Sequence, residues 1–108
     1  MKIKELKLYY KYKNINIPNT EYIFIGIDNK NYYWFIYKNE IFDTPFSFLN
    51  NYDFDSEQIV NALNLETSFD EDGEKCIKGY EWEIYSEENV ETNFKPILKD
   101  KLNNIINR

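Results

Sequence analysis

The apolar positions of the chain are densest between residues 22 and 38. Residues 22–27 and 32–38 are almost entirely β-branched or aromatic, and the polar segment 28–31 separates them. Because Asp and Asn tolerate left-handed backbone angles, this segment predicts a turn between two strands. Neither run alternates apolar with polar residues, so both strands are apolar on both faces, which a strand at a solvated edge would not be. The hairpin is therefore predicted to form the centre of a sheet.

Two other segments alternate apolar with polar side chains, as half-exposed strands do. In residues 3–12, lysines occupy polar positions and discourage pairing at an open edge. In residues 76–85, Glu81 and Glu83 alternate with apolar side chains, and Gly79 predicts a bulge. Together with the hairpin, the pattern predicts a mainly antiparallel sheet of about four strands, at residues 3–12, 22–27, 32–38 and 76–85.

Helical periodicity begins at two places in the chain. Residues 55–58 have the spacing of a capping box, and the apolar stripe that follows predicts a helix over residues 56–64. Pro96 is tolerated only in the first turn of a helix, and a further apolar stripe predicts a second helix over residues 94–106. A shorter helical segment of about one turn is expected over residues 45–50.

These two main helices are expected to pack together on one face of the sheet. The opposite face then needs a loop, a second copy of the chain or a partner to cover it, or it stays partly exposed. That face carries either Tyr33, Phe35 and Tyr37 or the alternating set Tyr32, Trp34 and Ile36. The sequence therefore predicts an α+β fold. At 108 residues and without an evident linker, the chain is expected to form a single domain over residues 1–108.

Charge is strongly segregated along the chain, whose net charge is −6. Residues 1–13 carry a charge of +4, residues 40–91 carry fifteen acids against two lysines, and residues 95–108 carry +3. Acidic density on this scale repels nucleic acid and attracts basic protein surfaces, so we expect no direct binding to nucleic acid. The alternative is that these acids serve only to keep the protein soluble.

The chain lacks the residues that most catalytic and metal-binding sites require. The chain has no His, one Cys and three isolated Gly, which excludes His-activated nucleophiles, Cys/His zinc sites and phosphate-binding glycine loops. The acidic segment 70–73 matches a calcium loop poorly, because Ser68 and Gly79 fall where the first ligand and the bidentate glutamate are required. We therefore predict no catalytic residue, no metal and no cofactor.

The leading hypothesis is a small acidic, non-enzymatic protein that binds and inhibits a protein with a basic surface. Nucleic-acid-handling proteins carry such surfaces, so the chain would act as a nucleic-acid mimic. Immunity proteins that neutralise toxins and phage-encoded inhibitors of host defence, such as anti-restriction or anti-CRISPR proteins, have this build. The analogy is one of type, and no family motif accompanies it. The residues expected to meet the partner are Asp70, Glu71, Asp72, Glu74, Glu81, Glu83, Glu87, Glu88 and Glu91.

Two further hypotheses remain open. In the first, the chain is an oligomeric adaptor or structural domain that uses Tyr33, Phe35 and Tyr37 as an aromatic interface, with a homodimer as one form. In the second, carboxylates and tyrosine hydroxyls in a shallow pocket bind a small ligand or catalyse a reaction.

Location is expected to be cytoplasmic, in the host cell if a phage encodes the chain. No apolar run reaches the length of a membrane span, and no secretion signal is evident at residues 1–5. The single Cys76 cannot form an internal disulfide, which is compatible with a reducing compartment.

Overall fold

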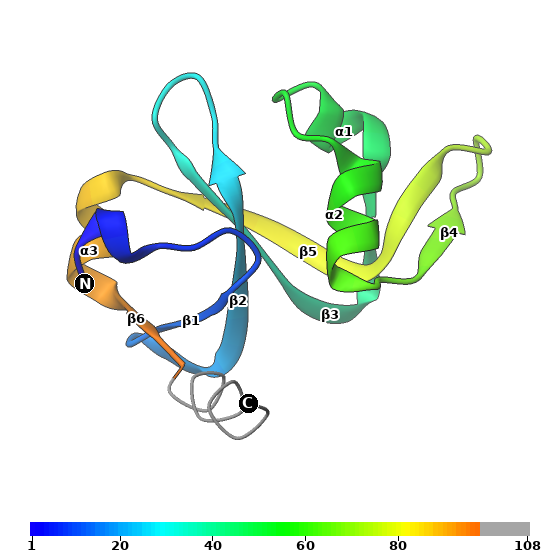
Figure 1. The fold of residues 1–108 in the computed structure, drawn as a ribbon. Coiled ribbons are helices and arrows are strands. Elements are labelled where there is room, and N and C mark those ends of the chain that lie inside the picture. Colours follow the sequence, from blue (N-terminus) through cyan, green and yellow to red (C-terminus); the bar gives the residue numbers. More distant parts are fainter. Residues whose placement is uncertain (98–108) are drawn as a thin grey trace, which may run out of the picture.

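A computed structural model describes residues 1–97, which form an antiparallel sheet with short helices on both of its sides (Figure 1). The sheet has six strands in the order β4-β5-β3-β2-β1-β6. The strands are β1 Lys11–Asn14, β2 Ile17–Ile27, β3 Tyr33–Pro45, β4 Thr67–Phe69, β5 Lys75–Tyr85 and β6 Phe94–Pro96. The helices are α1 Phe46–Asn50, α2 Ser56–Leu63 and α3 Glu87–Asn93, and a 3-10 turn spans Ile3–Glu5. The predicted α+β class is confirmed, with more strands than expected.

The central hairpin of β2 and β3 is confirmed, and its turn is organised by Asp28. One carboxylate oxygen of Asp28 accepts hydrogen bonds from the backbone N–H groups of Lys30 and Tyr32, at 2.9 and 3.0 Å. The other oxygen accepts from the Trp34 indole at 2.9 Å. Burial raises the pKa of Asp28, but the hydrogen bonds from Trp34, Tyr32 and Lys30 together lower it below its ordinary value. The turn is thereby fixed to the core of the sheet.

Both faces of this hairpin are buried, including the face whose covering the sequence left open. Trp34 is 1% exposed on one face and Phe35 is 0% exposed on the other. The helix-side core lies under α1 and α2 and comprises Ile23, Ile25, Trp34, Ile36, Phe46, Leu49, Ile59 and Ile77. The concave-side core lies on the opposite face and comprises Tyr12, Tyr22, Phe24, Tyr33, Phe35, Val90 and Phe94.

The sheet curls strongly around the concave-side core. The ring centroids of Tyr85 in β5 and Phe94 in β6 are 4.9 Å apart. These strands are four positions apart in the sheet order, which would separate them by about 19 Å in a flat sheet. The curl brings α3 and the N-terminal segment over this face, and Met1, Ile3 and Leu6 pack against its core (Figure 1). Helices therefore lie on both faces of the sheet, whereas the sequence placed its two main helices together on one face.

The predicted strand over residues 3–12 is wrong except at its end. β1 begins only at Lys11, although the Tyr9 N–H and the Tyr10 carbonyl also form hydrogen bonds with the backbone of Phe24 in β2. Residues 3–5 form a 3-10 turn instead. Leu6 packs on the concave-side core whereas Tyr9 packs on the helix-side core. The chain makes this change of face with Tyr9 in the left-handed region, at φ 69°, which interrupts a regular strand.

The strands on either side of the central turn are longer than predicted. β2 begins at Ile17 and includes Pro18, and β3 continues past residue 38 to Pro45. The pairing of β3 with β5 shifts register between Lys38 and Asp43, opposite Gly79, whose φ is 73°. This irregularity confirms the bulge expected at Gly79, because a left-handed residue breaks the ladder at little cost when it is glycine.

Two predicted helical segments are confirmed and one is corrected. The carboxylate of Asp55 accepts a hydrogen bond from the Gln58 backbone at 3.1 Å and caps α2, and α1 forms the short helix expected over residues 45–50. The predicted helix over residues 94–106 is wrong where it can be compared, because Phe94–Pro96 forms β6, paired with β1. The remainder of that predicted helix, from residue 98, lies outside the described residues.

Candidate functional site

The nine acids singled out by the sequence occupy three places along β5. Asp70, Glu71, Asp72 and Glu74 lie in the turn between β4 and β5, which we call the acidic turn. Glu81 and Glu83 lie within β5, and Glu87, Glu88 and Glu91 lie in α3. β5 has eleven residues, so the acidic turn and α3 are up to about 36 Å apart at its two ends (Figure 1). The structure therefore does not bring all nine acids together in one surface.

The acidic turn is shaped by two of its own carboxylates. One oxygen of Asp70 accepts hydrogen bonds from the backbone N–H groups of Asp72 and Glu74, both at 2.9 Å. The carboxylate of Glu74 accepts a hydrogen bond from the backbone N–H of Ser47 in the first turn of α1, at 3.2 Å. Glu71 and Asp72 are exposed, and within residues 1–97 their carboxylates form no hydrogen bond or ion pair. The turn thus displays these two charges to solvent.

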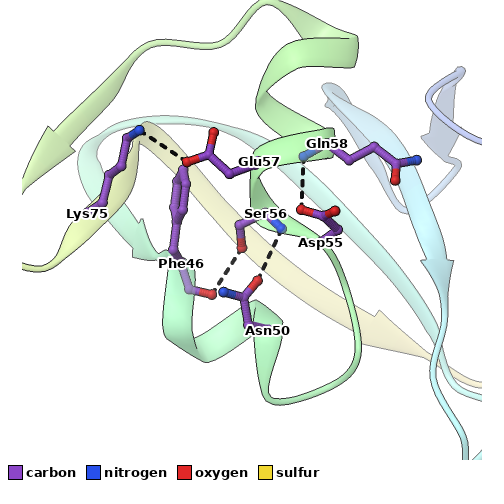
Figure 2. A network of polar contacts seen from close by, with 7 residues as sticks. All are labelled: Phe46, Asn50, Asp55, Ser56, Glu57, Gln58 and Lys75. Atoms are coloured by element: carbon purple, nitrogen blue, oxygen red, sulfur yellow. Dashed lines mark hydrogen bonds and ion pairs between the residues drawn. The ribbon is translucent and has the colours of Figure 1, made fainter.

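The base of the same hairpin is fastened to the helices, as Figure 2 shows. The Lys75 ammonium lies 3.2 Å from the Glu57 carboxylate of α2 and 5.4 Å from the centroid of the Phe46 ring. Ser56, the first residue of α2, donates through its hydroxyl to the Phe46 carbonyl at 3.0 Å, and its backbone N–H donates to the side-chain oxygen of Asn50 at 3.1 Å. These contacts hold α1, α2 and the start of β5 in a fixed arrangement.

The two acids inside β5 are engaged by neighbouring side chains. The amide of Asn39 donates to Glu81 at 2.8 Å, and the Tyr85 hydroxyl donates to Glu83. Burial raises the pKa of Tyr37 and Tyr85, and the neighbouring glutamates raise it further, because a tyrosinate beside a carboxylate is repelled. Glu81 and Glu83 are therefore half-buried parts of a hydrogen-bonded cluster rather than freely displayed charges.

The acids of α3 are partly used inside the molecule. The Tyr33 hydroxyl donates to Glu87 at 3.3 Å, and the amino group of Met1 donates to the backbone carbonyl of Glu91 at 2.7 Å. Glu88 and the carboxylate of Glu91 are exposed on the surface of α3. The basic N-terminal segment lies against this helix, so α3 presents a mixed surface rather than a purely acidic one (Figure 1).

The aromatic interface expected at Tyr33, Phe35 and Tyr37 is not a surface in this fold. Tyr33 and Phe35 are buried in the concave-side core, and Tyr37 is half-buried at its margin. The curl of the sheet, together with α3 and the N-terminal segment, covers the face that the sequence left open. Homodimerisation through these three residues therefore has no exposed ring face to begin from, apart from part of Tyr37.

Partly exposed aromatic rings do lie on the opposite face of the sheet, the face that carries Trp34. The rings of Phe48 and Trp82 lie 4.5 Å apart between centroids, and those of Trp34 and Tyr52 lie 4.7 Å apart. Tyr52 is exposed, whereas Phe48 and Trp82 are half-buried. The alternating pattern of residues 76–85 predicts which face of the sheet Trp82 occupies. Only the fold shows that α1 leaves part of its ring exposed.

The structure also reveals strand β4, which is not among the four strands that the sequence predicted. β4 is the outermost strand at one end of the sheet and pairs only with β5 among the described strands. Thr67 and Phe69 are its exposed residues. A segment of three residues gives too little alternation to be recognised, so its β-branched and aromatic residues were the only available signal.

A groove of about 390 Å³ lies between the C-terminal end of α2 and strands β3 and β5. Lys38, Lys78, Glu40 and Glu66 line it, together with the Tyr80 side chain. Lys78 lies 3.9 Å from Glu66, so the charges of this groove largely offset one another. Among residues 1–97, no three His, Cys, Asp or Glu side chains converge as a metal site would require.

Across residues 1–97, no helix has both the length and the apolar character needed to span a bilayer. Comparison of the chain with protein-family models, curated proteins and solved structures gave no match.

Proposed function

We propose that this chain is a non-enzymatic acidic protein that binds and inhibits a protein with a basic surface, of the kind that handles nucleic acid. The acidic turn is the contact surface in this proposal. The observation that carries it is the display of Glu71 and Asp72 on a turn whose shape is set by Asp70 and Glu74. A partner whose basic surface binds phosphates would be blocked by these carboxylates.

Preorganisation supports this choice of surface over the other acids. The acidic turn is held by hydrogen bonds within itself and to α1, so its charges lose little conformational freedom on binding. By contrast, Glu81 and Glu83 are already engaged by Asn39 and Tyr85. A partner that took over these carboxylates would first have to break those contacts.

The non-enzymatic part of the proposal rests on the chemistry of the described residues. The exposed acids of the turn lie on a projecting hairpin, whereas carboxylate catalysis requires two acids facing each other across a cleft (Figure 1). The groove beside α2 carries both lysines and glutamates at its margin, and Lys78 lies 3.9 Å from Glu66 there, so the charges of the groove largely offset one another.

The test is site-specific cross-linking followed by an inhibition assay. A photoreactive amino acid at position 71, in cells of the natural source, is expected to cross-link a protein with a basic surface. The purified partner should then lose nucleic-acid binding when the wild-type chain is added. The double variant Glu71→Lys, Asp72→Lys should lose this inhibition, whereas Glu88→Lys, Glu91→Lys, which changes charge equally, should retain it. Equal inhibition by both double variants would overturn the proposal.

A further inference from the structure

The outer edge of β4 carries backbone groups that face away from the sheet. The Asp70 N–H donates to the Glu74 carbonyl at 2.9 Å, and the Lys78 N–H donates to the Glu66 carbonyl at 3.0 Å. Residues 66 and 70 therefore bond toward β5. Along an antiparallel strand, the backbone N–H and C=O groups of successive residues point alternately toward the paired strand and away from it. Thr67 and Phe69, which alternate with residues 66, 68 and 70, therefore turn these groups outward. Among residues 1–97, no strand lies beyond them.

At the other end of the sheet, the sequence of β6 disfavours pairing with a further strand. The Ile97 N–H donates to the Lys11 carbonyl, and the Ile15 N–H donates to the Asn93 carbonyl. By the same alternation, Phe94 and Pro96 face outward in β6, and Pro96 has no N–H to offer. Proline and lysine are residues that proteins place on edges to prevent pairing, and β6 contains Lys95 and Pro96.

β4 contains neither of these protective residues. Its sequence is Thr67-Ser68-Phe69, and the Phe69 side chain is 69% exposed. A β-branched residue and an aromatic ring favour pairing with another strand. The two edges of the sheet therefore differ. Of the two, the β4 edge has both outward backbone N–H donors and exposed apolar side-chain surface.

The negative charge around the β4 edge favours pairing with a basic segment. Residues 66–78 carry five acids and two lysines, with Glu66 at one end of β4 and the acidic turn at the other. Asp43 lies beside the strand and accepts a hydrogen bond from the Ser68 hydroxyl at 3.2 Å. A second copy paired antiparallel about Ser68 would place Asp70 opposite Glu66, and like charges directly opposite each other destabilise a strand pair.

We propose that β4 accepts an extended basic segment of the partner protein as an additional antiparallel strand. The outward groups of Thr67 and Phe69 would form the backbone hydrogen bonds. Lysine or arginine side chains of the segment would lie against Glu66 and the acidic turn. This inference rests on the proposed function, because it identifies the part of the basic partner that the acidic hairpin binds.

Amide hydrogen exchange on the full chain tests this pairing, with a synthetic octapeptide of alternating lysine and threonine as the probe. In the free protein, the amides of Thr67 and Phe69 should exchange rapidly and that of Ser68 slowly. The peptide should slow exchange at Thr67 and Phe69. The same peptide with every backbone nitrogen methylated keeps its charge and should give no protection. Equal protection by both peptides, no protection by either, or protection that rises with protein concentration alone would overturn the inference.

Two substitutions at position 69 separate the contribution of the backbone N–H to peptide binding from that of the side chain. Phe69→Pro removes an outward N–H that the fold does not use and should weaken peptide binding about tenfold. Phe69→Thr also removes the ring but keeps the N–H, so it should retain most of the affinity. If Phe69→Pro does not fold, the methylated peptide still decides the matter.

The inference and the proposed function can fail separately. If Glu71→Lys, Asp72→Lys abolishes inhibition of the cross-linked partner while Phe69→Pro inhibits like the wild type, strand addition is wrong and the acidic contact stands. If neither variant changes inhibition, both are wrong.

Discussion

The rings of Tyr85 and Phe94 meet with their centroids 4.9 Å apart, although their strands are separated by three others in the sheet. Phe94 also stacks on Phe35, 4.7 Å away, and lies 5.5 Å from Tyr22. This one side chain therefore joins the last strand of the sheet to the central hairpin. We expect the curl of the sheet to depend on it.

Replacing Phe94 with Ala should lower the free energy of unfolding by about 3–5 kcal/mol, because the ring is 2% exposed and its removal leaves a cavity. Phe69→Ala is the matched control, since that ring is 69% exposed and its loss should cost less than about 0.5 kcal/mol. Urea unfolding followed by circular dichroism measures both. Equal losses for the two variants would show that Phe94 does not close the sheet.

Asp28→Asn should destabilise the protein at neutral pH and much less in acid. The pKa of Asp28 lies below its ordinary value of 3.8 in the folded state. Its ionised form therefore contributes stability above the unfolded pKa, and this contribution is lost as the pH falls through the folded pKa. Urea unfolding at pH 7 and at pH 3 should show the difference between wild type and variant shrinking in acid. A difference that grew in acid would contradict the hydrogen bonding assigned to the turn.

Gly26→Ala should cost more stability than Gly73→Ala. Both glycines have positive φ, 136° and 79°, so any side chain strains the backbone at either position. At Gly26, however, an added Cβ would also lie 2.7 Å from the Phe54 ring, whereas at Gly73 it would meet nothing within 4 Å. We expect a loss of about 1 kcal/mol at Gly73 and about 2–3 kcal/mol at Gly26. Thermal unfolding of both variants would refute this order if Gly73→Ala were the less stable.

Local signals in the sequence were sufficient for much of the fold. The cap of α2 at Asp55 and the two-faced hairpin of β2 and β3 depend on residues close together in the chain, and both are as predicted. The Asp28 turn lies where the polar segment indicated. Such features follow from short-range backbone and burial preferences, which a single sequence contains.

The features that the sequence did not reveal depend on contacts between distant residues. β4 and β6 have three residues each, and they are strands because β5 and β1 pair with them. The contact of Phe94 with Phe35 requires a curled sheet, and that curl buries Tyr33, which had been expected at an interface. The nine acids, all between residues 70 and 91, are likewise distributed over three places along β5. Within the acidic turn, Glu71 and Asp72 are the two whose carboxylates are not used inside the described part of the chain.

The most direct measurement of the central claim is the salt dependence of binding to the cross-linked partner. For the wild-type chain, affinity should fall steeply as salt rises, because exposed carboxylates contact basic residues. The double variant Glu71→Lys, Asp72→Lys should weaken binding at low salt more than tenfold and flatten the salt dependence. The double variant Glu88→Lys, Glu91→Lys should leave the affinity and its salt dependence close to those of the wild type. An affinity that does not change with salt, or a salt dependence that Glu71→Lys, Asp72→Lys leaves intact, would contradict the assignment of the acidic turn as the binding surface.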